Sequence, residues 1–148
     1  MSPVEILDRL IQVCIDSEKR YEHAASDVGR GDLERFFRRQ AANRKAAAGE
    51  LQARRAKLGV LKEESGSLAG MMDRIEMDLS VIHSMGDSGV VDWCREDAEK
   101  VEAEYNQILN SSEVPADLRP VLERQSGEVR STLSELNRVL QAYGGPRS

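Results

Sequence analysis

The start of the chain decides the fold, through residues 2–29, which read SPVEILDRLIQVCIDSEKRYEHAASDVG. Ser2, Pro3 and Glu5 match a helix-capping box: a Ser N-cap, a proline in the first turn and a glutamate at N3. Apolar residues then recur every three or four positions, which is the spacing of one buried helical face. We therefore expect a helix of about 26 residues, roughly 40 Å long, that ends at Gly29.

The same spacing returns in the next stretch of the chain. Asp32 is the predicted N-cap of a second helix of similar length, and Gly59 is its predicted stop. Because only residues 29–31 separate the two helices, they are expected to pack as antiparallel neighbours. Two alanines near the end of the first helix then lie level with Phe36 and Phe37, so small residues face large ones.

Three further helices are predicted from the rest of the apolar pattern. They cover about residues 67–85, residues 90–110, and a last segment that begins near 114–117 and ends before Gly144, with a break at residues 86–89. Pro120 is tolerated only in a first turn. The helix of residues 67–85 is long enough to carry the chain back along the bundle, which predicts an up, down, crossover, down, up arrangement.

Composition limits the classes of protein to which the chain can belong. The 148 residues are 40% hydrophobic and 32% charged, which is typical of one folded domain spanning residues 1–148. We expect no signal peptide and no membrane span, and a cytoplasmic location. The net charge of −5 disfavours nucleic-acid binding. Cys14 and Cys94 are expected to stay reduced, at different levels of the bundle.

Several short motifs, spread over nearly the whole chain, carry a family resemblance. They are DSE at 16–18 with Tyr21 and Ala24-Ala25, ESGSLAG at 64–70, Cys94 with Tyr105, and VP at 114–115 with VLERQ at 121–125. In this order the motifs resemble a family of small bacterial ferritin-like four-helix-bundle proteins of uncharacterised function. The resemblance implies an all-α, ferritin-like four-helix bundle in the cytosol, with distant kinship to di-iron carboxylate proteins.

A ferritin-like di-iron centre requires a Glu from each of two helices and a Glu-x-x-His motif from each of the other two. The only two histidines are His23 and His83, and the residues three positions before them are Arg20 and Ser80. The Glu-x-x-His motif is therefore missing from the sequence. The sequence predicts no cofactor, and the chemistry of a di-iron centre is not expected.

Glu18 is the one charged residue on the apolar stripe of the first helix. A buried carboxylate needs a partner, and counting residues through the antiparallel pair places Arg44 at its level. We therefore predict a structural core ion pair between Glu18 and Arg44, assisted by Gln40 or Gln125. The alternative is a degenerate carboxylate site for iron or manganese.

The candidate metal ligands of that alternative are Glu18, Glu99, Glu102 and Glu128. No phosphate-binding loop or catalytic triad is recognisable, so an enzyme is not the preferred interpretation. Two hypotheses follow. The first is a non-catalytic bundle that acts through its surfaces, as a homo-oligomer or with a protein partner, in a stress-related or interaction role. The second is a metal-binding ferritin relative.

Overall fold

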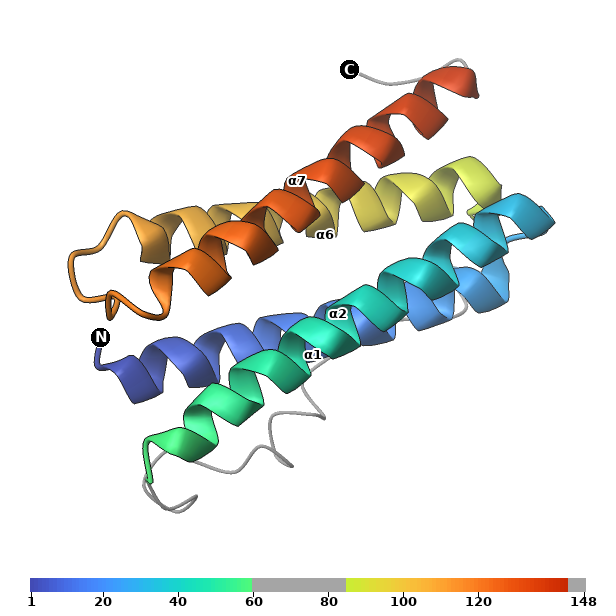
Figure 1. The fold of residues 1–148 in the computed structure, drawn as a ribbon. Coiled ribbons are helices and arrows are strands. Elements are labelled where there is room, and N and C mark those ends of the chain that lie inside the picture. Colours follow the sequence, from blue (N-terminus) through green and yellow to red (C-terminus); the bar gives the residue numbers. More distant parts are fainter. Residues whose placement is uncertain (60–84, 144–148) are drawn as a thin grey trace.

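The computed structural model describes residues 1–59 and 85–143, which form a bundle of four α-helices without strands in these ranges (Figure 1). The helices are α1 (Pro3–Asp27), α2 (Gly31–Lys57), α6 (Gly86–Leu109) and α7 (Arg119–Ala142). The prediction of an all-helical four-helix bundle is confirmed. None of these helices is long and apolar enough to cross a membrane.

The helix boundaries confirm most of the local signals and correct two of them. Ser2 caps α1 as predicted, because its Oγ accepts from the Glu5 N–H and its own N–H donates to the Glu5 carboxylate. The N-cap of α2 is Arg30, so Asp32 lies in the first turn instead. There Asp32 accepts from the Leu33 N–H at 3.0 Å and forms an ion pair with Arg30, which leaves it unable to cap.

The predicted break at residues 86–89 is instead the first turn of α6. Gly86 has a φ of 73°, a conformation that glycine adopts without strain, and the helix starts at this residue. The Asp87 carboxylate accepts from the Gly29 N–H at 2.8 Å, which joins the start of α6 to the turn between α1 and α2. The predicted crossover helix of residues 67–85 lies almost wholly outside the described residues.

The last helix begins two residues later than the end of the predicted window. Residues 115–118 form a turn in which the Leu118 N–H donates to the Pro115 carbonyl at 3.0 Å. Pro120 is then the second residue of α7, which confirms its predicted place in a first turn. The turn before α7 approaches the N-terminus of the chain, where the Met1 amino group contacts the Glu113 carboxylate.

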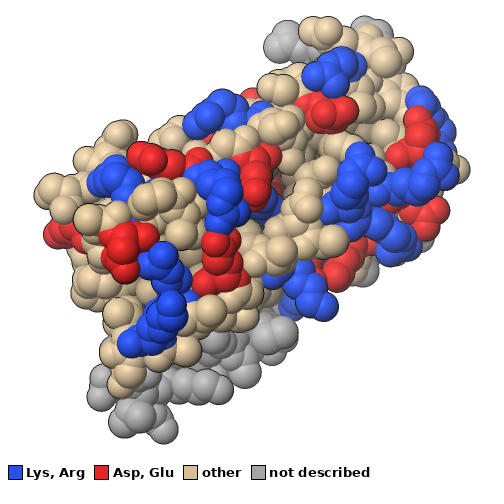
Figure 2. All heavy atoms as spheres, in the orientation of Figure 1, with Lys and Arg blue, Asp and Glu red and all other residues tan. Residues whose placement is uncertain are grey.

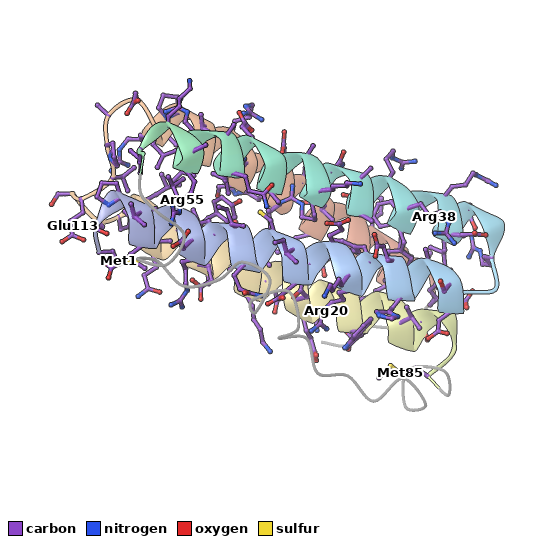
Figure 3. All side chains as sticks on the ribbon, turned by 90° about the horizontal axis from the view of Figure 1, so that it is seen from below. Met1, Arg20, Arg38, Arg55, Met85 and Glu113 are labelled. Atoms are coloured by element: carbon purple, nitrogen blue, oxygen red, sulfur yellow. The ribbon has the colours of Figure 1, made fainter. Side chains whose placement is uncertain are left out.

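The four helices run up, down, down and up. Arg55, near the end of α2, donates to Asp8 near the start of α1 at 2.8 Å, so α1 and α2 are antiparallel as predicted. The start of α6 lies beside the other end of α1, as the contact between Asp87 and Gly29 shows. Consequently α2 ends and α6 begins at opposite ends of the bundle, which the positions of Arg55 and Met85 also show (Figures 1 and 3).

The core consists of two apolar clusters along the bundle axis. The proximal cluster, beside the start of α1, contains Ile6, Leu10, Cys14, Leu51, Tyr105 and Leu122 among others. The distal cluster, beside the turn between α1 and α2, contains Tyr21, Phe37, Val91, Cys94, Ala98 and Leu136 among others. Both cysteines are free and belong to different clusters, as the sequence predicted.

Candidate functional site

A layer of polar side chains lies near mid-bundle, at and beside the junction of the two apolar clusters, and all four helices contribute to it. Its most buried members are Ser17 of α1, Arg44 of α2 and Gln125 with Ser126 of α7, none more than 3% exposed. Asp97 of α6 completes the layer. Metal-binding bundles of this kind place their ligands at the centre, between facing helices. A metal or catalytic site of this bundle is therefore expected in this layer.

Arg44 is the buried cation of the layer. Its Nη2 lies 3.5 Å from Oε1 of Glu128, on α7, and the Glu128 side chain is 45% exposed. In the part of the chain that the structure describes, neither Nη1 nor Nη2 of Arg44 has a hydrogen-bond partner. A guanidinium keeps its charge in proteins, so Arg44 brings a permanent positive charge and unused donors to the centre of the bundle.

The structure pairs Arg44 with Glu128 in place of the predicted Glu18. Glu18 is only half-buried on α1, where partial burial and a hydrogen bond with Glu22 raise the pKa of its carboxyl. The nearby positive charges that lower this pKa belong to Lys45 and Lys19. The prediction placed Glu18 at the right level along the bundle axis but on the wrong side of α1. Ser17 takes the buried polar position instead.

Asp97 joins α6 to α1 through an ion pair and a hydrogen bond. It accepts from the Ser17 hydroxyl at 3.1 Å, and its Oδ1 lies 3.3 Å from Nε of Arg20. The Arg20 guanidinium in turn lies 4.3 Å from the centroid of the Trp93 ring, within range of a cation–π interaction. Burial raises the pKa of the Asp97 carboxyl, although Arg20 and Ser17 both act to lower it.

A chain of hydrogen bonds runs from Tyr105 in the core to Glu50 of α2, near the surface. Tyr105 donates to Oε1 of Gln125 at 2.8 Å, and Gln125 donates to Oε1 of Glu50 at 3.0 Å. Glu50 also accepts from Arg124 at the surface. Because Tyr105 has one proton, the Cys14 thiol, 3.3 Å from its oxygen, must be the donor of that contact.

Burial holds the cysteine of this chain of hydrogen bonds in the unreactive form. Burial raises the pKa of the Cys14 thiol, and no part of the residue is exposed to solvent. Burial also raises the pKa of Tyr105, so the hydroxyl stays protonated. A protonated, inaccessible thiol is a poor nucleophile and a poor metal ligand. The network therefore stabilises the packing of α1 against α6 and α7 and offers no catalytic group.

The four predicted metal candidates are not brought together. Glu99 forms an ion pair with Arg95 at 2.8 Å, and Glu102 forms one with Arg130 at 3.0 Å. Glu128 and Glu18 have the contacts described above. Within residues 1–59 and 85–143, no group of three acidic, Cys or His side chains has the geometry to hold a metal ion. The residues at the centre, above all Arg44, do not fit a di-iron centre.

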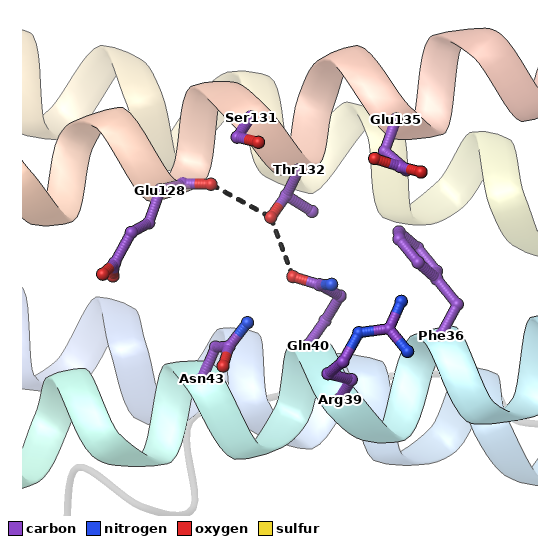
Figure 4. A pocket seen from close by; sticks show the side chains of 8 residues that line it. All are labelled: Phe36, Arg39, Gln40, Asn43, Glu128, Ser131, Thr132 and Glu135. Atoms are coloured by element: carbon purple, nitrogen blue, oxygen red, sulfur yellow. Dashed lines mark hydrogen bonds between the residues drawn. The ribbon is translucent and has the colours of Figure 1, made fainter.

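A groove of about 240 Å³ opens beside this layer, between α2 and α7 (Figure 4). The α2 wall is formed by Phe36, Arg39, Gln40 and Asn43, and the α7 wall by Glu128, Ser131, Thr132 and Glu135. The Thr132 hydroxyl lies 2.8 Å from Oε1 of Gln40 and bridges the two walls. Glu128 therefore belongs both to the groove and to the ion pair with Arg44.

Sequence reasoning missed Asp97, Ser17 and the groove. Asp97 stands next to Ala98 on the apolar stripe of α6, and a charged residue beside a small one on such a stripe is a signal of a buried polar contact. Gln125 was predicted to assist a core ion pair, and it is buried, between Leu122 and Val129 with helical spacing. The groove had no such signal, because it depends on how two distant helices meet.

Comparison with known families gives one match. The model of a family described as "Domain of unknown function (DUF2383)" matches residues 2–111, most of the chain, so the chain belongs to this family. The prediction of a family of uncharacterised function is thereby confirmed. The matched stretch contains α1, α2 and α6, and α7 follows it. The comparison with curated proteins found no match.

Proposed function

We propose that this DUF2383 member is a non-catalytic, ferritin-like bundle whose centre is held by Arg44 and its carboxylate partner in place of a di-iron site. The order of helix directions, with one connection between opposite ends of the bundle, supports the ferritin-like assignment. The single observation that carries the proposal is the burial of Arg44, which is 3% exposed, in the mid-bundle layer.

A buried guanidinium opposes a metal centre on electrostatic grounds. Its charge repels a divalent cation, and this repulsion is strong in a poorly solvated interior. Carboxylates that bridge two irons would have to leave their arginine partners, and Glu128, Glu102 and Glu99 each have one. The enzyme assignment therefore finds no support in the site, and the proposal stays with a binding role.

The binding role that we propose is association through the bundle surface, with a second copy of the chain or with another protein in the cytoplasm, in a stress-related or interaction role. The exposed side of α2 carries Arg35, Arg38 and Arg39, whereas α6 exposes Glu96 and Glu99. Charges of both signs are interspersed over the face shown in Figure 2. Charges of both signs allow complementary contacts between copies, whereas neither membrane nor nucleic acid is an expected partner.

Elemental analysis of the purified protein tests the metal part of the proposal. We expect substoichiometric iron and manganese in the wild type, unchanged in Glu18→Ala and Glu128→Ala. Arg44→Leu removes the central positive charge and serves as the control for its effect on metal content. Stoichiometric metal that is lost in either glutamate variant would establish the alternative, a degenerate carboxylate site, and overturn the proposal.

Light scattering after size-exclusion chromatography tests the association part. A homo-oligomer held by charge complementarity dissociates as salt rises from about 0.05 M to 1 M, because the Debye length shrinks over that range. Reversing the charge at Arg35 and Arg38 together is expected to give monomers already at low salt. A protein that stays monomeric in all conditions would rule out the homo-oligomer and leave only a different partner.

A further inference from the structure

The cluster formed by Arg44, Glu128 and the groove between α2 and α7 carries an inference beyond the proposed role. Arg44 combines 3% exposure with two terminal nitrogens that have no hydrogen-bond partner in the described residues. A buried, unsatisfied donor costs about 1–3 kcal/mol, and the cost is larger for a charged group. A side chain that costs stability in this way is typical of a binding site rather than of a packing position.

Glu128 lies between Arg44 and the groove. Its carboxylate is 3.5 Å from Nη2 of Arg44 and 3.4 Å from Nη1 of Arg124, so it contacts both guanidiniums at the edge of the ion-pair range. The first contact is too long for a hydrogen bond. Glu128 is half-exposed and retains Arg124 as a partner, so it can turn to Arg124 when another carboxylate takes its place at Arg44.

The charges around the groove favour an anion with a carboxylate group. The other carboxylate in the wall, that of Glu135, already pairs with Arg138 at 3.2 Å. Arg39 forms no ion pair among the described residues, and its guanidinium lies 5.8 Å from the centroid of Phe36. Arg39 at the rim and Arg44 behind Glu128 therefore supply two guanidiniums with free donors, which suit the planar fork of a carboxylate.

We propose that the α2–α7 groove binds a small carboxylate metabolite, whose carboxylate displaces Glu128 and binds Arg44, while Arg39 and Asn43 contact the rest of the molecule. The volume of about 240 Å³ suits a small acid better than a nucleotide-sized cofactor. No bond is made or broken in this step, and Glu128 moves toward Arg124. The inference is independent of whether the chain forms oligomers.

Titration of the full chain with acetate, succinate and glutarate, followed by NMR and calorimetry, tests this proposal. Succinamide is the neutral control of the same shape as succinate, and inorganic phosphate tests whether any anion suffices. We expect at least one carboxylate to bind with 1:1 stoichiometry and to shift the resonances of groove residues. Succinamide and phosphate are expected to leave these resonances unchanged.

The variants distinguish a displaced carboxylate from a general attraction to positive charge. Glu128→Gln removes the competing carboxylate and is expected to tighten binding about two- to fivefold, whereas Arg44→Gln weakens it about tenfold or more. Arg39→Gln weakens binding less, and Arg9→Gln, which removes an exposed arginine of α1 outside the groove, is the control with no change. Circular dichroism confirms that each variant is folded.

Three results would overturn the inference. In the first, none of the three carboxylates binds at tens of millimolar. In the second, phosphate binds as tightly as the carboxylates and responds to the variants in the same way. In the third, Glu128→Gln binds the carboxylate more weakly than the wild type does. Because Glu128 is half-exposed, Glu128→Gln is expected to fold even if Arg44→Gln does not, so the decisive variant remains measurable. Elemental analysis does not depend on these results, so the failure of one proposal is distinguishable from failure of the other.

Discussion

The two sides of α2 are built differently, although neighbouring residues supply them. Toward α1, the Phe37 ring is fully buried and stacks on Tyr21 with 6.0 Å between centroids, and Arg55 pairs with Asp8 in the interior. Toward α7, the adjacent Phe36 lines a groove, and the adjacent Arg54 pairs with Asp117 at the surface. The α1–α2 seam is thus a closed core, and the α2–α7 seam is open and polar.

The difference between the two seams follows from residue direction and from the connections between the helices. Successive helical residues point about 100° apart, so a phenylalanine or an arginine changes its environment with a shift of one position. The short turn between α1 and α2 enforces close packing along the whole of their seam. No short turn joins α2 to α7, and long polar side chains bridge their seam, among them Gln40, Glu50 and Gln125.

The largest expected effect compares Phe37→Ala with Phe36→Ala. Loss of the Phe37 ring leaves a cavity in the closed core, which should lower the free energy of unfolding by about 3–5 kcal/mol. Phe36 is also part of the distal cluster, but its ring borders the groove, where water can fill part of the vacated space, so its loss should cost less. Urea unfolding followed by circular dichroism measures both. Equal losses in the two variants would contradict the distinction between the seams.

The second comparison uses the two arginine pairs at the end of α2. Asp8→Ala removes the carboxylate that Arg55 contacts at 2.8 Å in the interior, and breaking a buried pair costs up to about 3–5 kcal/mol. The side chains of Asp8 and Arg55 are 11% and 10% exposed, whereas that of Asp117 is 80% exposed. Asp117→Ala should therefore change the free energy of unfolding by no more than about 1 kcal/mol.

Thermal unfolding of the two aspartate variants measures this contrast. Asp8→Asn is the control that keeps the shape of the side chain and removes its charge. If Asp117→Ala proves as destabilising as Asp8→Ala, the α2–α7 side contributes more to stability than its exposure indicates.

The sequence predicted the closed seam well because its signals are local. The capping box at Ser2, the apolar spacing of α1 and the short turn before α2 together determine the first hairpin. Asp32 was assigned as a cap because its residue type fits, but its carboxylate is engaged by Arg30, and no rule of spacing reveals that competition. Local patterns thus located the helix and missed its first residue.

The open seam could not be predicted, because it depends on rotation as well as on level. Counting residues gave the level of Arg44, but it did not say which carboxylate at that level faces it. Glu18 and Ser17 differ by one residue in sequence and by about 100° in direction, and Ser17 is the buried one. Glu128 comes from α7, whose position against α2 is not determined by any short connection.

The smallest expected effects concern pH, where the buried contact between α1 and α6 and the open α2–α7 seam should respond with opposite sign. Burial raises the pKa of Asp97, so just above the ordinary pKa of aspartate the folded protein holds more protons than the unfolded chain. Its contribution to the free energy of unfolding therefore falls as pH rises through that window. Arg124 holds the pKa of Glu50 below its ordinary value, so the contribution of Glu50 is lost as pH falls.

Two variants make this difference measurable by urea unfolding between about pH 4 and pH 7, a range above the ordinary pKa of aspartate. Relative to the wild type, Asp97→Asn should gain stability as pH rises, because it removes a carboxyl that is costly to ionise in the interior. Glu50→Gln should lose stability relative to the wild type over the same rise in pH. The loss should be no more than about 1 kcal/mol, because the ion pair between Glu50 and Arg124 is partly exposed. The stability of both variants relative to the wild type could instead change in the same direction with pH. In that case Arg20 fully offsets the effect of burial on the pKa of Asp97, and the contact between α1 and α6 behaves like the surface pairs of the α2–α7 seam.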